Sequence, residues 1–253
     1  MDSSFQNEKV NDIVGLSNKL PSNSIPSKLI SLVVEQQQQQ YNVEQNLSTS
    51  NSNLVKNFNS TPKTTQVQTP SQNSPVKPKS IFSSNYQDTE MDVLIEMVIL
   101  TLETIIKHND QIPIDPECLT QFHSSTPPLI SLRDYIKRIV RFALLEKTCL
   151  LMIMAYIDRL CKSKNFVISS LTVHRVLAST VVISCKTVCD NYFSNSHYAK
   201  IVGLGLVELN SLEMETLTRL DWKLSVSFES LQHYYIVMVK NMIKLNPNFT
   251  SYF

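Results

Sequence analysis

Apolar positions divide the chain into two parts. From about residue 81 onward, apolar side chains recur every three or four residues, the spacing that places them on one face of an α-helix. In residues 1–80, 46 of the 80 residues are Ser, Thr, Asn, Gln or Pro. The apolar side chains that remain are too few to offset the conformational entropy that the segment would lose on folding. The sequence therefore predicts a disordered tail over residues 1–80 and one all-α domain over residues 81–253.

Seven helices are predicted in the second part. Between Pro128 and Pro247 the chain has no proline and only two glycines, so little interrupts the helical pattern. Thr89 is expected to cap the first helix, with Asp92 three residues on. Gly203 is expected to end the fifth. The predicted helices span residues 89–108, 131–144, 146–162, 170–189, 197–202, 207–220 and 227–245.

The helix predicted over residues 170–189 is apolar on nearly every face, which is typical of a buried central helix. Lys186 follows ten uncharged residues of that helix. Because an unpaired buried ammonium is costly, Lys186 must reach the surface at the helix end or find a partner. Glu213, beside Leu212 and near Leu217 on a later helix, meets the same constraint.

Composition excludes several classes of protein. Lys and Arg number 23 against 22 Asp and Glu, a balance that argues against a strongly basic nucleic-acid binder. Three glycines in the whole chain are too few for a glycine-rich phosphate loop. The first residues lack the pattern of a signal peptide, and the longest uncharged apolar runs fall short of the ~20 residues of a membrane span. We expect a soluble protein of the cytoplasm, the nucleus or both, with no membrane or nucleic-acid partner.

Candidate chemistry is sparse. Neither Gly-x-Ser-x-Gly nor His-Glu-x-x-His occurs, and no nucleophile pattern stands beside His174 or His233, so no catalytic residue and no cofactor are predicted. Cys185 and Cys189 are four residues apart and share a helical face, which would suit half of a metal site. No second Cys or His pair has matching spacing, and both are interpreted as core thiols rather than metal ligands.

Six segments together resemble a cyclin box, and more narrowly the P/U-type cyclins, a group related to the phosphate-starvation cyclin of budding yeast. They read YIKRI at 135–139, AYIDRL at 155–160, VHRV to ISCK over 173–186, NSHYAK at 195–200, ELNSLE at 208–213 and LDWKL at 220–224. Their order and spacing match, and the resemblance covers roughly residues 90–245.

The resemblance implies a single cyclin box, a five-helix bundle around a central third helix, with one extra helix on each side. It implies a regulatory subunit, not an enzyme, that forms a heterodimer with a cyclin-dependent serine/threonine kinase and activates it. Lys186 and Glu213 match the kinase-contacting residues of the box, and Arg138 and Asp158 match its structural ion pair. Two positions depart from the family pattern: Thr187 replaces a Phe, and Val202-Gly203 replaces Gly-Gly.

Two alternatives remain open. One is a cyclin-fold transcription factor or protein-interaction module, which a single box without a basic face disfavours. The other is an all-α enzyme with an unrecognised site, which the lack of a convergent polar cluster disfavours. In the tail, Ser74-Pro75-Val76-Lys77 has the pattern that proline-directed kinases favour, and Ser74 is a candidate phosphorylation site.

Overall fold

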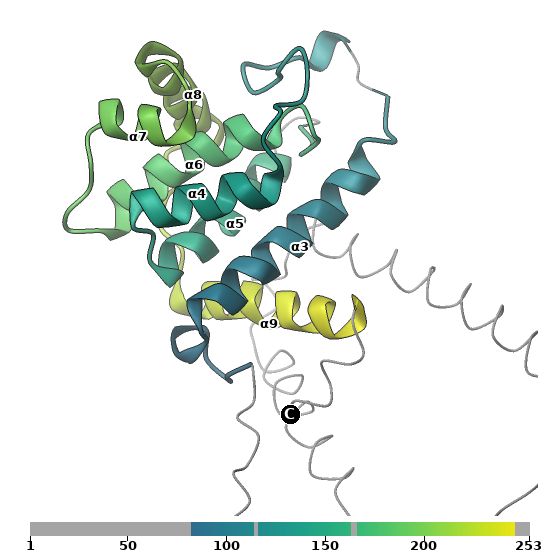
Figure 1. Cartoon of the computed structure of the whole chain (residues 1–253), viewed down its shortest axis with the longest axis vertical. Helices are drawn as coiled ribbons and strands as arrows, with labels where there is room; N and C mark the ends of the chain where they lie inside the picture. The colour runs from purple at the N-terminus through teal and green to yellow at the C-terminus, as the bar shows by residue number, and fades with distance from the viewer. Residues whose placement is uncertain (1–81, 114–115, 163–165, 246–253) are drawn as a thin grey trace, which may run out of the picture.

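The structure, a computed structural model, describes residues 82–113, 116–162 and 166–245. The predicted tail, Ser74 included, lies outside this part of the chain. Within it the protein is all-helical, as predicted, with two short 3-10 turns and no strand (Figure 1). The α-helices are α3 (Met91–Asn109), α4 (Leu132–Ala143), α5 (Lys147–Lys162), α6 (Val173–Val188), α7 (Asn195–Val202), α8 (Leu206–Arg219) and α9 (Phe228–Leu245).

Local capping explains where several helices begin and end. The Ser131 hydroxyl accepts the Asp134 amide at 3.1 Å before α4, and the Ser194 hydroxyl accepts the His197 amide before α7. Gly203 ends α7 with a φ of 73°, the left-handed conformation that glycine adopts without strain. These features lie in the local sequence, and the helices they bound were predicted to within two residues.

The cap predicted at Thr89 is wrong. Helix α3 begins at Met91 after Glu90, which makes no side-chain cap. The Thr89 hydroxyl instead donates to the Tyr235 hydroxyl on α9 at 2.7 Å, both side chains being buried. A tertiary hydrogen bond has replaced the local one because α9 packs beside the start of α3.

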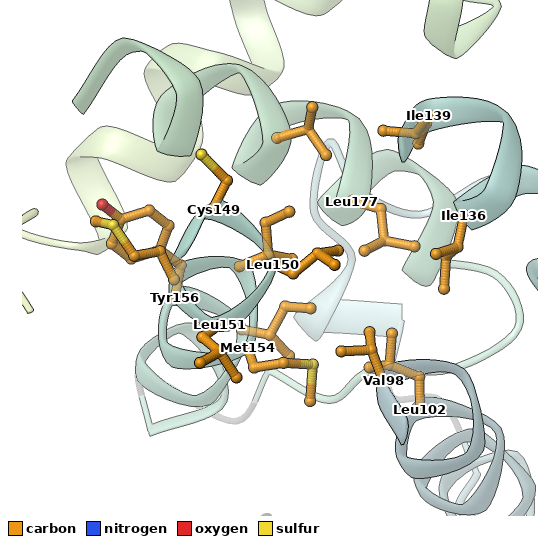
Figure 2. Close-up of a cluster of buried hydrophobic side chains, with 14 of the residues drawn as sticks. Val98, Leu102, Ile136, Ile139, Cys149, Leu150, Leu151, Met154, Tyr156 and Leu177 are labelled. Carbon is orange, nitrogen blue, oxygen red and sulfur yellow. The ribbon is translucent and has the colours of Figure 1, made fainter. Parts of the chain in front are cut away.

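Two helices, α5 and α6, form the centre of the bundle. They pack against each other, α5 also contacts α3 and α9, and α6 also contacts α7 and α8. The prediction that α6 is buried and central is confirmed; α5 is buried as completely, with every residue from 149 to 158 inside the core. Figure 2 shows side chains of α3, α4, α5 and α6 converging there, among them Val98, Ile136, Leu150, Met154 and Leu177.

The five helices α4 to α8 match the expected box, with α3 before it and α9 after it. Figure 1 shows α3 and α9 lying together along one side of the bundle, and both contact α5. The segment before α3 belongs to this layer, since Phe82 and Tyr86 are buried and the Tyr86 ring lies 5.6 Å from that of Phe228. None of the described helices combines the length and apolarity needed to cross a bilayer.

Candidate functional site

The structure brings Lys186 and Glu213 together. Lys186 lies in the last turn of α6 and Glu213 on α8, two helices that pack side by side. The Lys186 Nζ donates to Glu213 Oε1 at 2.7 Å. The lysine side chain is 32% exposed and that of the glutamate 13%. The pair therefore sits at the surface, where a second protein could reach it.

One asparagine holds the glutamate, and a second asparagine holds the first. The Asn195 side-chain amide, at the start of α7, donates to Glu213 Oε2 at 2.7 Å and to Asn210 Oδ1 at 2.7 Å. Both oxygens of Glu213 are thus held by protein donors, so its orientation is set before any partner arrives. Neither asparagine stands out by a pattern along the chain; the available signal was that Asn195 and Asn210 lie in the matched segments 195–200 and 208–213.

Large apolar side chains are exposed on α8 and in the loop that follows it. Val207 is 83% exposed, Met214 54% and Trp222 61%. Helix α5 holds that loop in place: Arg159 donates to the carbonyl oxygens of Lys223 and Ser225 at 2.6 and 2.9 Å. A charged pair with exposed apolar groups on a fixed frame suits docking of a protein better than chemistry on a small molecule.

A second ion pair joins α6 to α8. Arg175 contacts the Glu208 carboxylate and also donates to the carbonyl oxygens of Gln121 and His123, at 2.8 and 3.1 Å. Arg175 lies in the matched segment 173–186, but no pattern along the chain assigns it a role. Its contacts fix the start of α8, and with it the helix that carries Glu213.

The structure does not bring Arg138 and Asp158 together, so the structural ion pair that the resemblance implied is corrected. Arg138 is exposed on α4 and donates to the Lys200 carbonyl oxygen at 3.1 Å. Asp158 is fully buried on α5. It accepts the Tyr234 hydroxyl of α9 at 2.7 Å and lies 3.3 Å from Lys162 Nζ. Helix α4 packs on α3 and α7, and this directs Arg138 toward α7, whereas α9 supplies the partner of Asp158.

Burial and the Asp158 carboxylate act together on Tyr234. Removal from water raises the pKa of the Tyr234 hydroxyl above its usual value, and the nearby negative charge raises this pKa further. Tyr234 therefore stays protonated and remains a hydrogen-bond donor to Asp158. This bond ties α5 to α9, a structural role.

The two departures from the family pattern have ordinary local environments. The Thr187 hydroxyl donates to the Ile183 carbonyl oxygen of its own helix at 2.7 Å. Val202 is buried, and its carbonyl oxygen accepts the Tyr135 hydroxyl at 3.2 Å. Thr187 thus leaves the position beside Lys186 without the large aromatic side chain of the family.

Known proteins similar to this chain include members of the cyclin family. The family model described as Cyclin matches residues 35–224, a span that begins inside the predicted tail and ends before α9. The Nuc-1 negative regulatory protein preg of Neurospora crassa is 36% identical over 159 residues, which are 61% of this chain and 33% of that protein.

Two further relatives carry the name cyclin. Cyclin-U3-1 of Arabidopsis thaliana is 36% identical over 123 residues, which are 48% of this chain and 56% of that protein. The PHO85 cyclin PHO80 of Saccharomyces cerevisiae is 34% identical over 152 residues, 58% of this chain and 52% of that protein. The chain thus spans about a third of the Neurospora relative and about half of each of the other two.

Proposed function

The chain belongs to the cyclin family, and we propose that it is the regulatory subunit of a cyclin-dependent serine/threonine kinase. The observation that carries the proposal is the Lys186–Glu213 pair, held at the surface between α6 and α8 at the two positions that match the kinase-contacting residues of the box. The name of the yeast relative, PHO85 cyclin PHO80, supports a partner of this kind.

The pair is suited to hold a docked helix. The Lys186 ammonium has three N–H donors, of which one contacts Glu213, so others can reach backbone carbonyl oxygens of a partner. Glu213 keeps the ammonium in place, and the exposed Met214 and Trp222 offer apolar area. Kinase catalysis requires the αC glutamate to pair with the β3 lysine. A subunit that binds the inward position of αC more tightly shifts the kinase toward its active state.

The remaining sequence predictions extend this proposal. The chain acts as a binding subunit without catalysis of its own, in the cytoplasm, the nucleus or both, and contacts neither nucleic acid nor membrane. The fold proper begins near residue 81, and Ser74 before it is a site of phosphorylation by a proline-directed kinase.

The first test is purification of the full chain from its native cell. A protein kinase should copurify in equal amount, whereas a chain recovered repeatedly without one would favour the interaction-module alternative. Binding to that kinase is then measured for Lys186→Ala and Glu213→Ala. Each should weaken binding by about 2–5 kcal/mol, as expected when a charged group that the bound kinase would bury is removed from the interface.

The matched control is Lys137→Ala. Lys137 is an exposed lysine whose Nζ lies 3.0 Å from the Glu96 carboxylate on α3. The Lys137→Ala variant therefore also loses an ion pair at the surface. Kinase affinity of Lys137→Ala should stay unchanged, and all three variants should keep their stability within about 1 kcal/mol, because ion pairs at the surface contribute little to folding. Normal binding by Lys186→Ala would contradict the proposed docking face.

Exchanging the charges of Lys186 and Glu213 distinguishes the contact within the chain from the contact with the kinase. The double variant Lys186→Glu with Glu213→Lys can re-form the ion pair across α6 and α8 and should melt like the native chain. It should still fail to bind the kinase, because the donors and acceptors then face the wrong partner groups. Recovery of native affinity would show that only the internal pair matters.

A further inference from the structure

Three cysteines meet at one end of α5 and α6. Cys149 lies in the first turn of α5, Cys185 in the last turn of α6, and Cys189 is the residue that caps α6. Their Sγ atoms all lie within 4.8 Å of one another, and those of Cys149 and Cys189 are 3.7 Å apart. None of the three is in a disulfide. Two helices of the core therefore hold three thiols in one small volume.

The spacing of the sulfurs suits a metal ion. Zn–S bonds of about 2.3 Å in a tetrahedral site place the sulfurs about 3.8 Å apart. The Cys149–Cys189 separation of 3.7 Å already has this value, and small side-chain rotations would complete the other edges. The backbone supports the arrangement, since the Cys189 amide donates to the Cys185 carbonyl oxygen at 2.9 Å and keeps both side chains on one side of the helix end.

The cluster is reachable from solvent. Cys149 and Cys185 are buried, but Cys189 is partly exposed. Cys185 and Cys189 also line a surface pocket of about 440 Å³ together with Glu146, Asp190 and Tyr198. An ion can reach Cys185 and Cys189 through this pocket, the Cys149 sulfur lies within 4.8 Å of both, and the pocket leaves room for a fourth ligand. Cysteines that only fill a core need neither access from solvent nor space for a further ligand.

We propose that Cys149, Cys185 and Cys189 bind one Zn²⁺ ion, with the fourth ligand, a water molecule or an added donor, entering from the pocket. Binding involves no oxidation: each thiol gives its proton to solvent and each sulfur shares a lone pair with the ion. Thiolate ligands select Zn²⁺ or Cu(I) among common ions. Three thiolates and Zn²⁺ leave a net charge of −1, whereas Cu(I) would leave −2. The cysteines lie beside the acidic residues Glu146 and Asp190 and two of them are buried, so the more negative Cu(I) site is disfavoured.

Metal binding would join the start of α5 to the end of α6, one residue from Lys186. The proposal does not rest on kinase binding, because every readout below uses the chain alone.

The full-length protein is purified with a non-thiol reductant, stripped with a chelator, and titrated with Zn²⁺ and with Co²⁺ as a spectroscopic substitute. We expect one ion per chain, a rise in melting temperature with Zn²⁺, and the thiolate-to-cobalt absorption of a tetrahedral sulfur site.

The variants are Cys189→Ser and its control Cys161→Ser, both at partly exposed cysteines. Cys189→Ser should lose at least tenfold in Zn²⁺ affinity and most of the cobalt absorption, whereas Cys161→Ser should bind like the native chain. As a measurement that needs no variant, Zn²⁺ should protect Cys189 from alkylation and leave Cys161 unaffected. Absence of bound Zn²⁺, binding of Cu(I) but not Zn²⁺, or equal binding by both variants would overturn the proposal.

Discussion

Two carboxylates of the bundle, Glu213 and Asp158, differ in how their charge is compensated. Glu213 is partly exposed, and both of its oxygens accept hydrogen bonds from Lys186 and Asn195. Asp158 is fully buried, and its Oδ1 has no hydrogen-bond partner among the described residues, while Oδ2 depends on Tyr234 and Lys162. The first carboxylate is therefore suited to an interface and the second to holding helices together.

Replacement of Asp158 tests this structural role. Asp158→Ala should lower the free energy of unfolding by about 1.5–3 kcal/mol, because it removes the charged acceptor of Tyr234 and leaves that hydroxyl buried without a partner. The loss should be smaller than for a fully buried ion pair, since the Lys162 side chain is 52% exposed and can return to water. Chemical denaturation measures the change.

Tyr234→Phe is the matched variant for Asp158→Ala. It removes the same hydrogen bond from the α9 side while keeping the ring, and it should also destabilise the chain. The double variant should lose less than the sum of the single losses, because both act on one bond. Additive losses, or an Asp158→Ala chain as stable as the native one, would contradict the assignment.

At the scale of elements, the junction between α7 and α8 sets the position of Asn195 relative to Glu213. Asn195 opens α7 and Glu213 lies on α8, and the two helices are joined by a short turn that contains Gly203 and Gly205. Gly203 has a φ of 73°, whereas Gly205 has a φ of −67°, a value open to any residue. The two glycines therefore have different structural importance despite being two residues apart.

Alanine substitution distinguishes the two glycines. Gly203→Ala should destabilise the chain by about 1–2 kcal/mol, the cost of a Cβ in the left-handed conformation. No atom lies within 4 Å of an added Cβ at either position, so steric contact does not complicate the comparison. Gly205→Ala should change stability by no more than about 0.5 kcal/mol. Thermal melts decide, and equal losses at both positions would show that φ is not the cause.

At the scale of the whole molecule, the layer of α3 and α9 depends on the residues just before α3. Phe82 and Tyr86 are buried, Thr89 bonds Tyr235, and the Tyr235 hydroxyl also donates to the Ser83 carbonyl oxygen at 2.7 Å. These contacts join positions about 150 residues apart in sequence. Within the described residues, the fold therefore includes Phe82 and the segment that leads into α3. The boundary near residue 80 stays a prediction.

Two truncations test that boundary. Removal of residues 1–80 should leave helicity, stability and kinase binding unchanged, because the composition of that segment offers little to a core. Removal of residues 1–90 takes away Phe82, Tyr86 and Thr89 as well, and should cost on the order of 5 kcal/mol, comparable to the whole stability of many domains. Circular dichroism and melts measure both. Equal behaviour of the two truncations would place the boundary elsewhere.

The sequence by itself determined the helices, the all-α class and the family. Apolar spacing, Ser131, Ser194 and Gly203 act within one or two turns of the backbone, so the local sequence determines their effect. The same locality explains how Lys186 could be placed at the end of a buried helix. The family resemblance matched both Lys186 and Glu213 to kinase-contacting positions, but the contact between them depends on how α6 and α8 pack.

Tertiary structure alone decided which distant side chains meet. Thr89 bonds Tyr235 rather than its own helix, Asp158 bonds Tyr234 rather than Arg138, and Cys149 joins Cys185 and Cys189 from another helix. No spacing along the chain encodes these pairs. They follow from the relative rotation and offset of packed helices, which the combined fit of many side chains in the core determines.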